Sequence, residues 1–288
     1  MIFIGENLHI ISKSVKNALI NKDKNFIKDL LNAQKNMDCV DLNIGPQSGI
    51  YEWLVPFVME NYSGNISFDT TNANEIETGL NIFKNCENCF INSASKNKDR
   101  FEKMSDLALK YNCNLILLTM DNGIPKTADE RLEIAMEMYE NATTKGLNPQ
   151  KLYFDPLILP VNVAQNQAME SINTLRMIKE TFEIAPKTLI GLSNISNGIP
   201  KEIKPIINRV FACYATACEL DGMIVNAKDT ELIRIVKMLK SQTPQYETDI
   251  LYTKIFDTIK NFGEIDNIEY NINSEEEQKI IKTCQILS

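Results

Sequence analysis

Eight short apolar runs alternate along the 288-residue chain with longer stretches of helical period. Runs this short, flanked by turn residues, predict parallel strands in repeated βα units rather than the strands of a sandwich. Eight such units predict an α/β fold whose strands close into a (β/α)8 TIM barrel. The runs are Met1–Gly5, Cys39–Ile44, Ile66–Phe68, Cys89–Ile91, Leu115–Met120, Leu152–Phe154, Thr188–Leu192 and Met223–Val225.

The stretches between the runs carry apolar residues at the spacing of helices that pack one face against a sheet. A single barrel of roughly 250 residues would use nearly all of the chain, so we expect one domain. The predicted helices are Ser14–Asn36, Tyr51–Asn61, Asn74–Lys84, Lys98–Tyr111, Ala128–Lys145, Ala168–Glu183, Lys201–Leu220 and Asp229–Lys240.

The segment after Lys240 is expected to pack outside the barrel. Tyr252–Phe262 predicts one more helix there. Ser274 is followed by three glutamates and then by Ile280 and Ile281, which is typical of a capped helix start.

Charge and composition exclude several classes of function. The formal net charge is -8 and there is no long basic run, which argues against a broad nucleic-acid surface. No apolar stretch reaches the roughly 20 residues of a membrane span, and the N-terminus lacks the pattern of a signal peptide. The seven cysteines form no regular framework, so we expect reduced thiols and a cytoplasmic protein.

Most of the runs end at an acidic or amide residue. In a TIM barrel the inward side chains at the carboxyl ends of the strands form the active site. A carboxylate offers two acceptors and an amide offers a donor and an acceptor, so together they can bind a flat, nitrogen-rich heterocycle such as a pterin. Capping of the following helix explains any one of these residues, but explains the set less well. The set is Asp69, Asn92, Asp155 and Asn194.

Two common barrel chemistries are weakly supported. The strand ends show no cluster of carboxylates and histidines for a catalytic metal, and no strand-borne lysine for a Schiff base. His9 is the only histidine, and we expect it in the loop after the first strand with a loop or packing role. Asp121 and Lys126, after the fifth strand, are expected to be solvated or to form turns.

Cysteine and tryptophan also have structural interpretations here. The pair Cys86-x-x-Cys89 has no second pair of matching spacing. It precedes the fourth strand, so it should lie at the opposite mouth of the barrel from the strand ends and have a structural role. Trp53 lies within a predicted helix and is expected in the core.

Five motifs in this order resemble the pterin-binding family, and specifically the methyltetrahydrofolate:corrinoid/iron-sulfur protein methyltransferases of the acetyl-CoA pathway. The likeness extends from Met1 to Phe262, which implies a pterin-binding TIM barrel over residues 1–262 and a C-terminal extension over 263–288. The motifs are Asp41-Leu-Asn-Ile-Gly-Pro46, Phe68-Asp-Thr-Thr-Asn72, Ile91-Asn-Ser93, Asp155-Pro-Leu-Ile-Leu-Pro160 and Gly191-Leu-Ser-Asn-Ile-Ser196.

The resemblance implies a homodimer that takes methyltetrahydrofolate as methyl donor. The methyl group would pass to the cobalt of a corrinoid (cobalamin) on a partner, either the corrinoid/iron-sulfur protein or a small corrinoid protein. Tetrahydromethanopterin could replace tetrahydrofolate, and no tightly bound metal of the chain's own is expected. Neither direction of transfer is favoured by the sequence.

The resemblance also implies roles for single residues. Asp155 would bind two adjacent N–H donors of the pterin, and Asn92 and Asp69 would hold the middle of the ring system. Asn197 stands where relatives carry a longer amide. The substrate-binding residues implied are Asp69, Asn92, Asp155, Gly191, Ser193 and Asn197.

Asn194 matches the catalytic asparagine of that family. An amide can rotate to accept a hydrogen bond from a protonated amine, which stabilises charge developing on the leaving nitrogen. No side chain is an obvious strong acid, so the proton is expected to arrive through water and the hydrogen-bond network.

Two alternatives remain open on the sequence. One is an enzyme similar to dihydropteroate synthase, against which we count the expected lack of basic residues where the seventh strand leads to Asn194 and the eighth to Asn226. The other is a non-catalytic subunit that binds folate or pterin.

Overall fold

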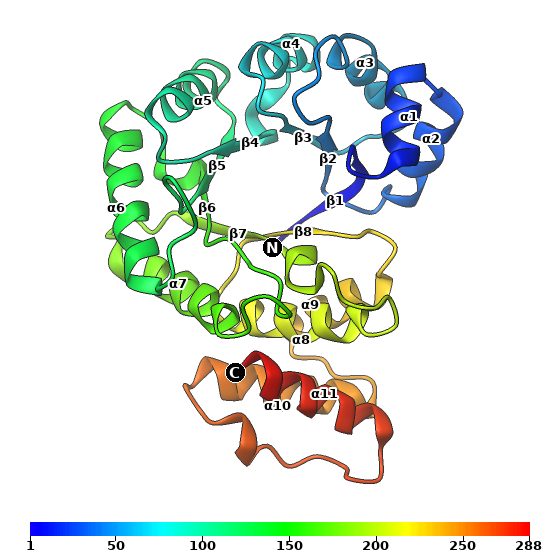
Figure 1. Cartoon of the computed structure of the whole chain (residues 1–288), viewed down its shortest axis with the longest axis vertical. Helices are drawn as coiled ribbons and strands as arrows, with labels where there is room; N and C mark the ends of the chain where they lie inside the picture. Colours follow the sequence, from blue (N-terminus) through cyan, green and yellow to red (C-terminus); the bar gives the residue numbers. More distant parts are fainter.

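The computed structural model describes all 288 residues. Eight parallel strands pair in chain order, and β8 pairs with β1 to close the barrel (Figure 1). The helices surround this ring, so the predicted TIM barrel is confirmed. The strands are β1 (Ile2–His9), β2 (Cys39–Asn43), β3 (Asn65–Asp69), β4 (Phe90–Ala94), β5 (Asn114–Leu118), β6 (Leu152–Asp155), β7 (Lys187–Gly191) and β8 (Gly222–Val225).

Most predicted helices lie within a few residues of the observed ones, and α3 and α5 have the predicted bounds. The barrel helices are α1 (Lys13–Asn21), α2 (Lys24–Ala33), α3 (Tyr51–Asn61), α4 (Ala73–Phe83), α5 (Lys98–Tyr111), α6 (Ala128–Thr144), α7 (Gln167–Thr181), α8 (Lys204–Ala217) and α9 (Thr230–Ser241). Short 3-10 turns are η1 (Cys86–Asn88), η2 (Pro149–Lys151), η3 (Leu192–Ser196) and η4 (Ile265–Asn267).

The prediction of one helix over Ser14–Asn36 is wrong. Lys22 adopts a left-handed conformation with φ of 53°, which ends α1 and turns the chain. The Asp23 side chain then accepts a hydrogen bond from the Phe26 N–H and caps α2. A capping aspartate inside a long periodic stretch was therefore the signal for two helices.

Three other boundaries need correction. His9 is the last residue of β1 rather than part of the following loop, and its Nδ1 accepts from the Ile11 N–H at 3.2 Å. Asn92 and Ser93 lie within β4 rather than after it. The helix predicted over Tyr252–Phe262 begins earlier, because α10 covers Glu247–Lys260.

A layer of apolar side chains fills the lower part of the barrel interior. We call this layer the plug; it contains Ile4, Cys39, Phe90, Ile116, Tyr153, Leu189 and Ile224, one from each of seven strands. The β3 residue at this level is Ser67, which pairs in register with Phe90 of β4. The Phe90 and Tyr153 rings pack edge to face at 4.9 Å between centroids. Side chains alternate along a strand, so the residue two positions after each plug residue also points inward, nearer the mouth.

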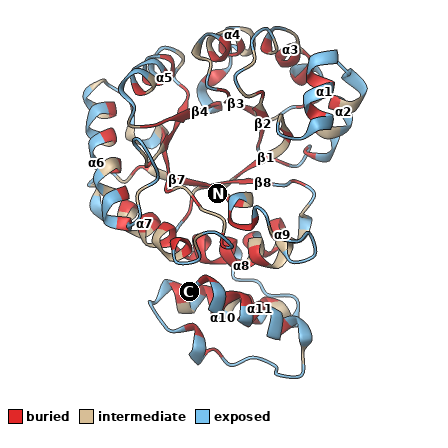
Figure 2. Cartoon of the chain, in the orientation of Figure 1, coloured by how far each residue is buried: buried red, intermediate tan, exposed pale blue.

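The other strand face packs against the helices in two large clusters. The strands and the inner faces of the helices are buried, whereas the outer helix faces are exposed (Figure 2). Trp53 is only partly buried and packs against the second cluster. Cys86 and Cys89 are buried in that cluster beside the start of β4, at the end of the barrel expected from the sequence. All seven cysteines are free and buried.

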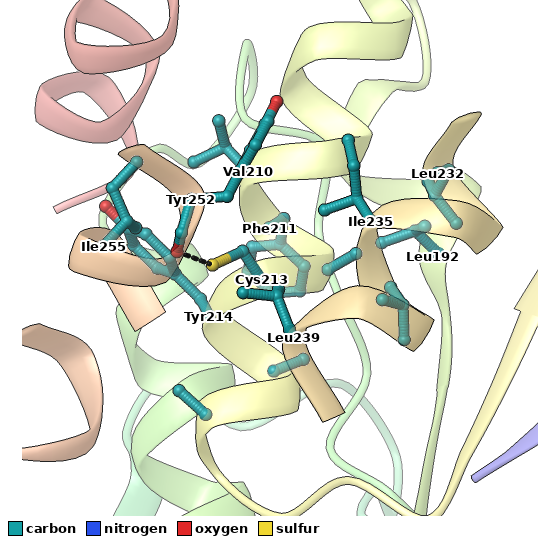
Figure 3. Packing of buried hydrophobic residues seen from close by; sticks show 14 of the residues in the cluster. Leu192, Val210, Phe211, Cys213, Tyr214, Leu232, Ile235, Leu239, Tyr252 and Ile255 are labelled. Atoms are coloured by element: carbon teal, nitrogen blue, oxygen red, sulfur yellow. Dashed lines mark hydrogen bonds between the residues drawn. The ribbon is translucent and has the colours of Figure 1, made fainter. Parts of the chain in front are cut away.

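The C-terminal helices α10 and α11 (Glu275–Leu287) lie outside the barrel against α8 (Figure 1), where the sequence predicts them. Their buried side chains belong to the same cluster as those of α8 and α9. In Figure 3 the Cys213 thiol of α8 donates to the Tyr252 carbonyl of α10 at 3.4 Å. Arg234 of α9 binds the fully buried Asp249 of α10 at 2.6 Å. None of the helices is long and apolar enough to cross a bilayer.

The packing of α11 predicts a large stability cost when one buried side chain is shortened. Ile281 is 4% exposed in the cluster with α8, so Ile281→Ala should lower the free energy of unfolding by about 2–5 kcal/mol. Ile286 on the same helix is 41% exposed, and Ile286→Ala should change it by less than about 0.5 kcal/mol. Urea denaturation of both variants measures this. Equal midpoints would mean that α11 is not part of the cooperative core.

Candidate active site

The site lies at the mouth of the barrel, one layer above the plug. Pleating places a polar side chain two residues after the plug residue in most strands, as at Ile4 and Glu6 or Tyr153 and Asp155. These side chains rest on an apolar floor that keeps water away from below. The residues of this layer are Glu6, Asp41, Asp69, Asn92, Asp155, Gly191 and Asn226.

Asp41 and Asp69 form a carboxyl pair on neighbouring strands. The Ser67 hydroxyl donates to Asp41 Oδ1 at 2.6 Å, and Asp69 shares a hydrogen bond with the same carboxyl group. Burial raises the pKa of Asp69 well above its usual range, and the nearby Asp41 raises it further. Each carboxyl group disfavours ionisation of the other, because like charges at short distance repel.

Two amide side chains complete the part of the mouth formed by β2, β3 and β4. Asn43 Nδ2 donates to Asp69 Oδ2 at 2.5 Å, and Asn92 Nδ2 donates to Asp41 Oδ1 at 3.3 Å. Arg100, at the start of α5, donates through Nε to the Ser93 carbonyl at 2.8 Å. Its charge lies near enough to Asp69 to oppose part of the rise in that pKa. The Asn92 side chain is thus held through its nitrogen, and its oxygen has no protein partner among these contacts.

Asp155 is the buried carboxylate of β6. It is 7% exposed and accepts the Leu157 N–H at 2.8 Å, together with the backbone N–H of Gly191 on the next strand. Burial raises its pKa to about 6, although these two hydrogen bonds and Arg131 act in the opposite direction. At neutral pH the group is mostly ionised, and an ionised carboxylate only accepts hydrogen bonds.

Arg131 of α6 supports Asp155 from behind. Its guanidinium is fully buried and donates to three neutral oxygens, of Ser171 at 3.0 Å, Gln167 at 2.6 Å and the Pro125 carbonyl at 3.3 Å. The Ser171 hydroxyl also donates to the Leu157 carbonyl at 3.1 Å. Leu157 is held at φ of 64°, a conformation rare for a leucine, which aims its N–H at Asp155.

The turn η3 carries the remaining predicted residues. Gly191 ends β7, and a side chain there would place its Cβ 3.1 Å from Asn194 Nδ2, close enough that the amide would have to shift slightly. Asn194 is exposed, and its carbonyl accepts the Asn197 N–H at 3.2 Å. Leu192 and Ile195 of the same turn are buried in the cluster around α8, which anchors η3.

Glu6 faces η3 from β1. The Ser193 hydroxyl donates to its carboxylate, and burial raises the pKa of Glu6 to about 7 despite this hydrogen bond. Glu6 and Ser193 line a cavity of about 410 Å³ between β1, β8 and the start of α8. The remaining polar lining residues are Ser196, Lys201, Lys204, Asn208, Asn226 and Asp229.

Strand order thus brings most of the predicted residues to one mouth. Asp69, Asn92, Asp155 and Gly191 lie in the last part of β3, β4, β6 and β7, whereas Ser193, Asn194 and Asn197 lie in or just after the turn η3, where both asparagines are exposed. Asp121 and Lys126 are exposed in the loop before α6, as predicted. The roles in binding stay predictions for Asp69, Asn92, Asp155, Gly191, Ser193 and Asn197.

Sequence reasoning missed several groups that shape the site. The pattern of polar residues at alternate positions in Cys39-Val-Asp-Leu-Asn43 was a signal for two inward groups. The ends of the seventh and eighth strands carry no cation, as expected, but Lys201 and Lys204, from just before and at the start of α8, line the cavity beside η3. The residues for which no role in the site was predicted are Glu6, Asp41, Asn43, Arg100, Arg131, Lys201 and Lys204.

Comparison with known proteins finds relatives on this barrel. The family described as "Pterin binding enzyme" matches residues 48–226. A methylcorrinoid:tetrahydrofolate methyltransferase of Eubacterium limosum is 24% identical over 243 residues, which are 81% of this chain and 88% of that protein. A methionine synthase of Mycobacterium tuberculosis is 26% identical over 202 residues, which cover 67% of this chain but only 16% of that protein.

Solved structures share the fold. A Yersinia pestis dihydropteroate synthase superposes with a TM-score of 0.57 at 15% sequence identity and covers 83% of this chain and 92% of that one. A dihydropteroate synthetase with a bound product has a TM-score of 0.58 at 17% identity. At such identities the likeness concerns the path of the backbone alone.

The buried charge of Asp155 predicts a pH-dependent stability cost. Its pKa is about 6 in the folded chain against an ordinary value of 3.8, so the folded state binds the proton more tightly than the unfolded state. Wild type should therefore lose up to about 3 kcal/mol of stability from this group as pH rises from 4 to 7. Asp155→Asn should gain stability relative to wild type over that range.

Urea denaturation of both proteins at pH 4 and pH 7 measures the effect. The difference in unfolding free energy between wild type and Asp155→Asn at each pH cancels the contributions of Glu6 and Asp69, which both proteins share. A difference that stays constant between the two pH values would contradict the raised pKa of Asp155.

Proposed function

The chain belongs to the family of pterin-binding enzymes, and from this premise we propose that it is a methyltransferase acting between 5-methyltetrahydrofolate and a corrinoid protein. The Eubacterium limosum relative is named for transfer from methylcorrinoid to tetrahydrofolate. A catalyst lowers the barrier in both directions, so one site serves either. We propose further that a corrinoid protein docks over the mouth, where the cobalt can reach the methyl group.

One observation carries the proposal. Asp155 accepts the backbone N–H of Gly191, the residue that opens the turn carrying Asn194. An acceptor suited to a pterin, at the end of β6, and an amide suited to a leaving amine, in the turn that follows β7, thus lie at one mouth. A flat ring bound to Asp155 by two adjacent N–H groups would extend across the mouth toward Asn92 and Asp69.

The residues of the mouth have different roles in the proposed reaction. Asp155 fixes the pyrimidine end of the ring, because its ionised carboxylate only accepts hydrogen bonds. Asn92 and the Asp41–Asp69 pair offer donors and acceptors along the ring's middle. Asn194 accepts a hydrogen bond from the methyl-bearing nitrogen once that nitrogen carries a proton, which stabilises its positive charge. The corrinoid supplies a low-valent cobalt nucleophile.

The dihydropteroate synthase alternative is less well supported by the same geometry. Its reaction must hold a diphosphate leaving group, which favours a cluster of cations. Lys201 and Lys204 do line the cavity beside η3, but the carboxyl groups of Glu6 and Asp229 line it as well. Arg209 already pairs with Asp229 at 2.8 Å. This mixed lining suits a proton-transfer region better than a diphosphate.

The proposal is tested by methyl transfer from 5-methyltetrahydrofolate to free cob(I)alamin under strict reduction, followed through the visible spectrum of cobalt. Wild type should form methylcobalamin. Tight pterin binding without transfer, also with several corrinoid proteins as acceptors, would favour the non-catalytic subunit instead.

Asn194→Ala should separate rate from binding. Loss of a group that stabilises charge mainly in the transition state should lower kcat by about 100-fold or more, with little change in the Kd for methyltetrahydrofolate. Asn197→Ala is the matched control, because it removes a predicted binding amide from the same turn and should raise Kd more than it lowers kcat. Wild-type turnover in Asn194→Ala at saturating donor would refute the assignment.

A further inference from the structure

Glu6 is a half-buried carboxyl of the mouth that hydrogen-bonds neither to another acid nor to a backbone N–H. The Asp69 carboxyl is committed to Asp41 and to Asn43, and Asp155 accepts two backbone N–H groups. Glu6 has one side-chain partner in the structure, the hydroxyl of Ser193. Its carboxyl group is therefore free to change its protonation state without breaking a network.

The position of Glu6 links the solvent to the catalytic turn. It sits two residues after Ile4 on the inward face of β1, directly above the plug. On one side it binds Ser193, the neighbour of Asn194 in η3. On the other side it lines the cavity of about 410 Å³, where Lys201 and Lys204 face it. A proton can enter through this cavity and leave toward η3.

We infer that Glu6 is the proton donor of the methyl transfer and delivers its proton through the Ser193–Asn194 turn to the methyl-bearing nitrogen. This inference rests on the proposed function. In the step, the protonated Glu6 carboxyl gives its proton to the Ser193 hydroxyl, which reverses the hydrogen bond made to the ionised group, and that hydroxyl passes its own hydrogen to the nitrogen. The carbon–nitrogen bond then breaks and its electron pair becomes the lone pair of the neutral N–H nitrogen, while cobalt(I) supplies the pair for the new cobalt–carbon bond. Glu6 regains a proton from water in the cavity, or gives one back when the reaction runs in reverse.

The charges around Glu6 suit this role. The pKa of Glu6 is raised to about 7, chiefly by burial and also by Asp41 of β2, while the hydrogen bond from Ser193 and the charge of Lys204 lower it. Asp229, which caps α9, and Lys201 face the same cavity. A donor whose pKa lies near the operating pH is both protonated often enough and acidic enough to be effective.

The test compares Glu6→Gln with wild type in transfer from 5-methyltetrahydrofolate to cob(I)alamin, at saturating donor and across pH 5.5 to 8.5. Glutamine still accepts from Ser193 but carries no transferable proton. Wild-type kcat should fall as pH rises through about 7, where Glu6 loses its proton. Glu6→Gln should lower kcat by about 100-fold and should remove the inflection near pH 7 from the pH profile of kcat, with an unchanged Kd for the donor. Glu6→Asp should recover part of the rate together with a pH inflection.

Glu202→Gln is the matched control. It removes an exposed carboxyl from the segment that leads into α8, outside the cavity lining, so rate and pH profile should follow wild type. A second readout needs no corrinoid: infrared difference spectra should show a carboxyl titrating near pH 7 in wild type and in Glu202→Gln, and this signal should be missing from Glu6→Gln.

The outcomes separate the inference from the function. A wild type that transfers methyl groups, together with a Glu6→Gln variant of equal rate and pH profile, would overturn the role of Glu6 and leave the proposed function intact. A wild type that transfers no methyl group would overturn both.

Discussion

The plug is the constraint on which the site depends. Seven apolar side chains close the barrel interior beneath the mouth, and strand pleating then forces the next inward residue of each strand to face a dry floor. Carboxyl groups placed there lose hydration on one side. Burial is accordingly the largest influence on the pKa values of Glu6, Asp69 and Asp155. A fold that keeps such groups must offset their cost with a large core elsewhere.

The mouth has two chemically different sides. From β2 to β6 its groups are fixed by hydrogen bonds, with Asp69 tied to Asn43 and Asp155 tied to the Leu157 N–H. Such fixed acceptors and donors suit recognition of a flat ring. From β7 through β8 to β1 the groups border an open cavity, and the proposed chemistry takes place there. Gly191 joins the two sides, because its N–H binds Asp155 and its bare Cα accommodates Asn194.

The C-terminal helices contribute to this arrangement at a distance. Leu192 and Ile195 of η3 belong to the same apolar cluster as α8, α10 and α11. Helix α8 is therefore clamped between the barrel and the extension, as the side chains in Figure 3 show. A turn whose buried side chains are fixed in this way can hold an exposed asparagine in one place. We propose that the division at residue 262 marks where the family pattern ends, while the packed unit outside the barrel already begins with α10.

Much of the fold and part of the site follow from local patterns. Strand ends such as Asp69, Asn92 and Asp155 are predictable because parallel strands of a barrel deliver their carboxyl ends to one mouth. Arg131 was not predictable, because its charge lies on a helix face where sequence period alone predicts an apolar residue, and only α7 shows what it binds. No role was predicted for Glu6, because the burial that raises its pKa and its contact with Ser193, 187 positions away in the chain, arise only in the folded barrel.

The most direct test of the account is a crystal structure with 5-methyltetrahydrofolate bound. The account predicts the pyrimidine edge on the Asp155 carboxylate, the ring's middle near Asn92, and the methyl-bearing nitrogen within hydrogen-bond distance of Asn194. A pterin bound in another cavity, or one with its methyl-bearing nitrogen turned away from η3, would contradict it.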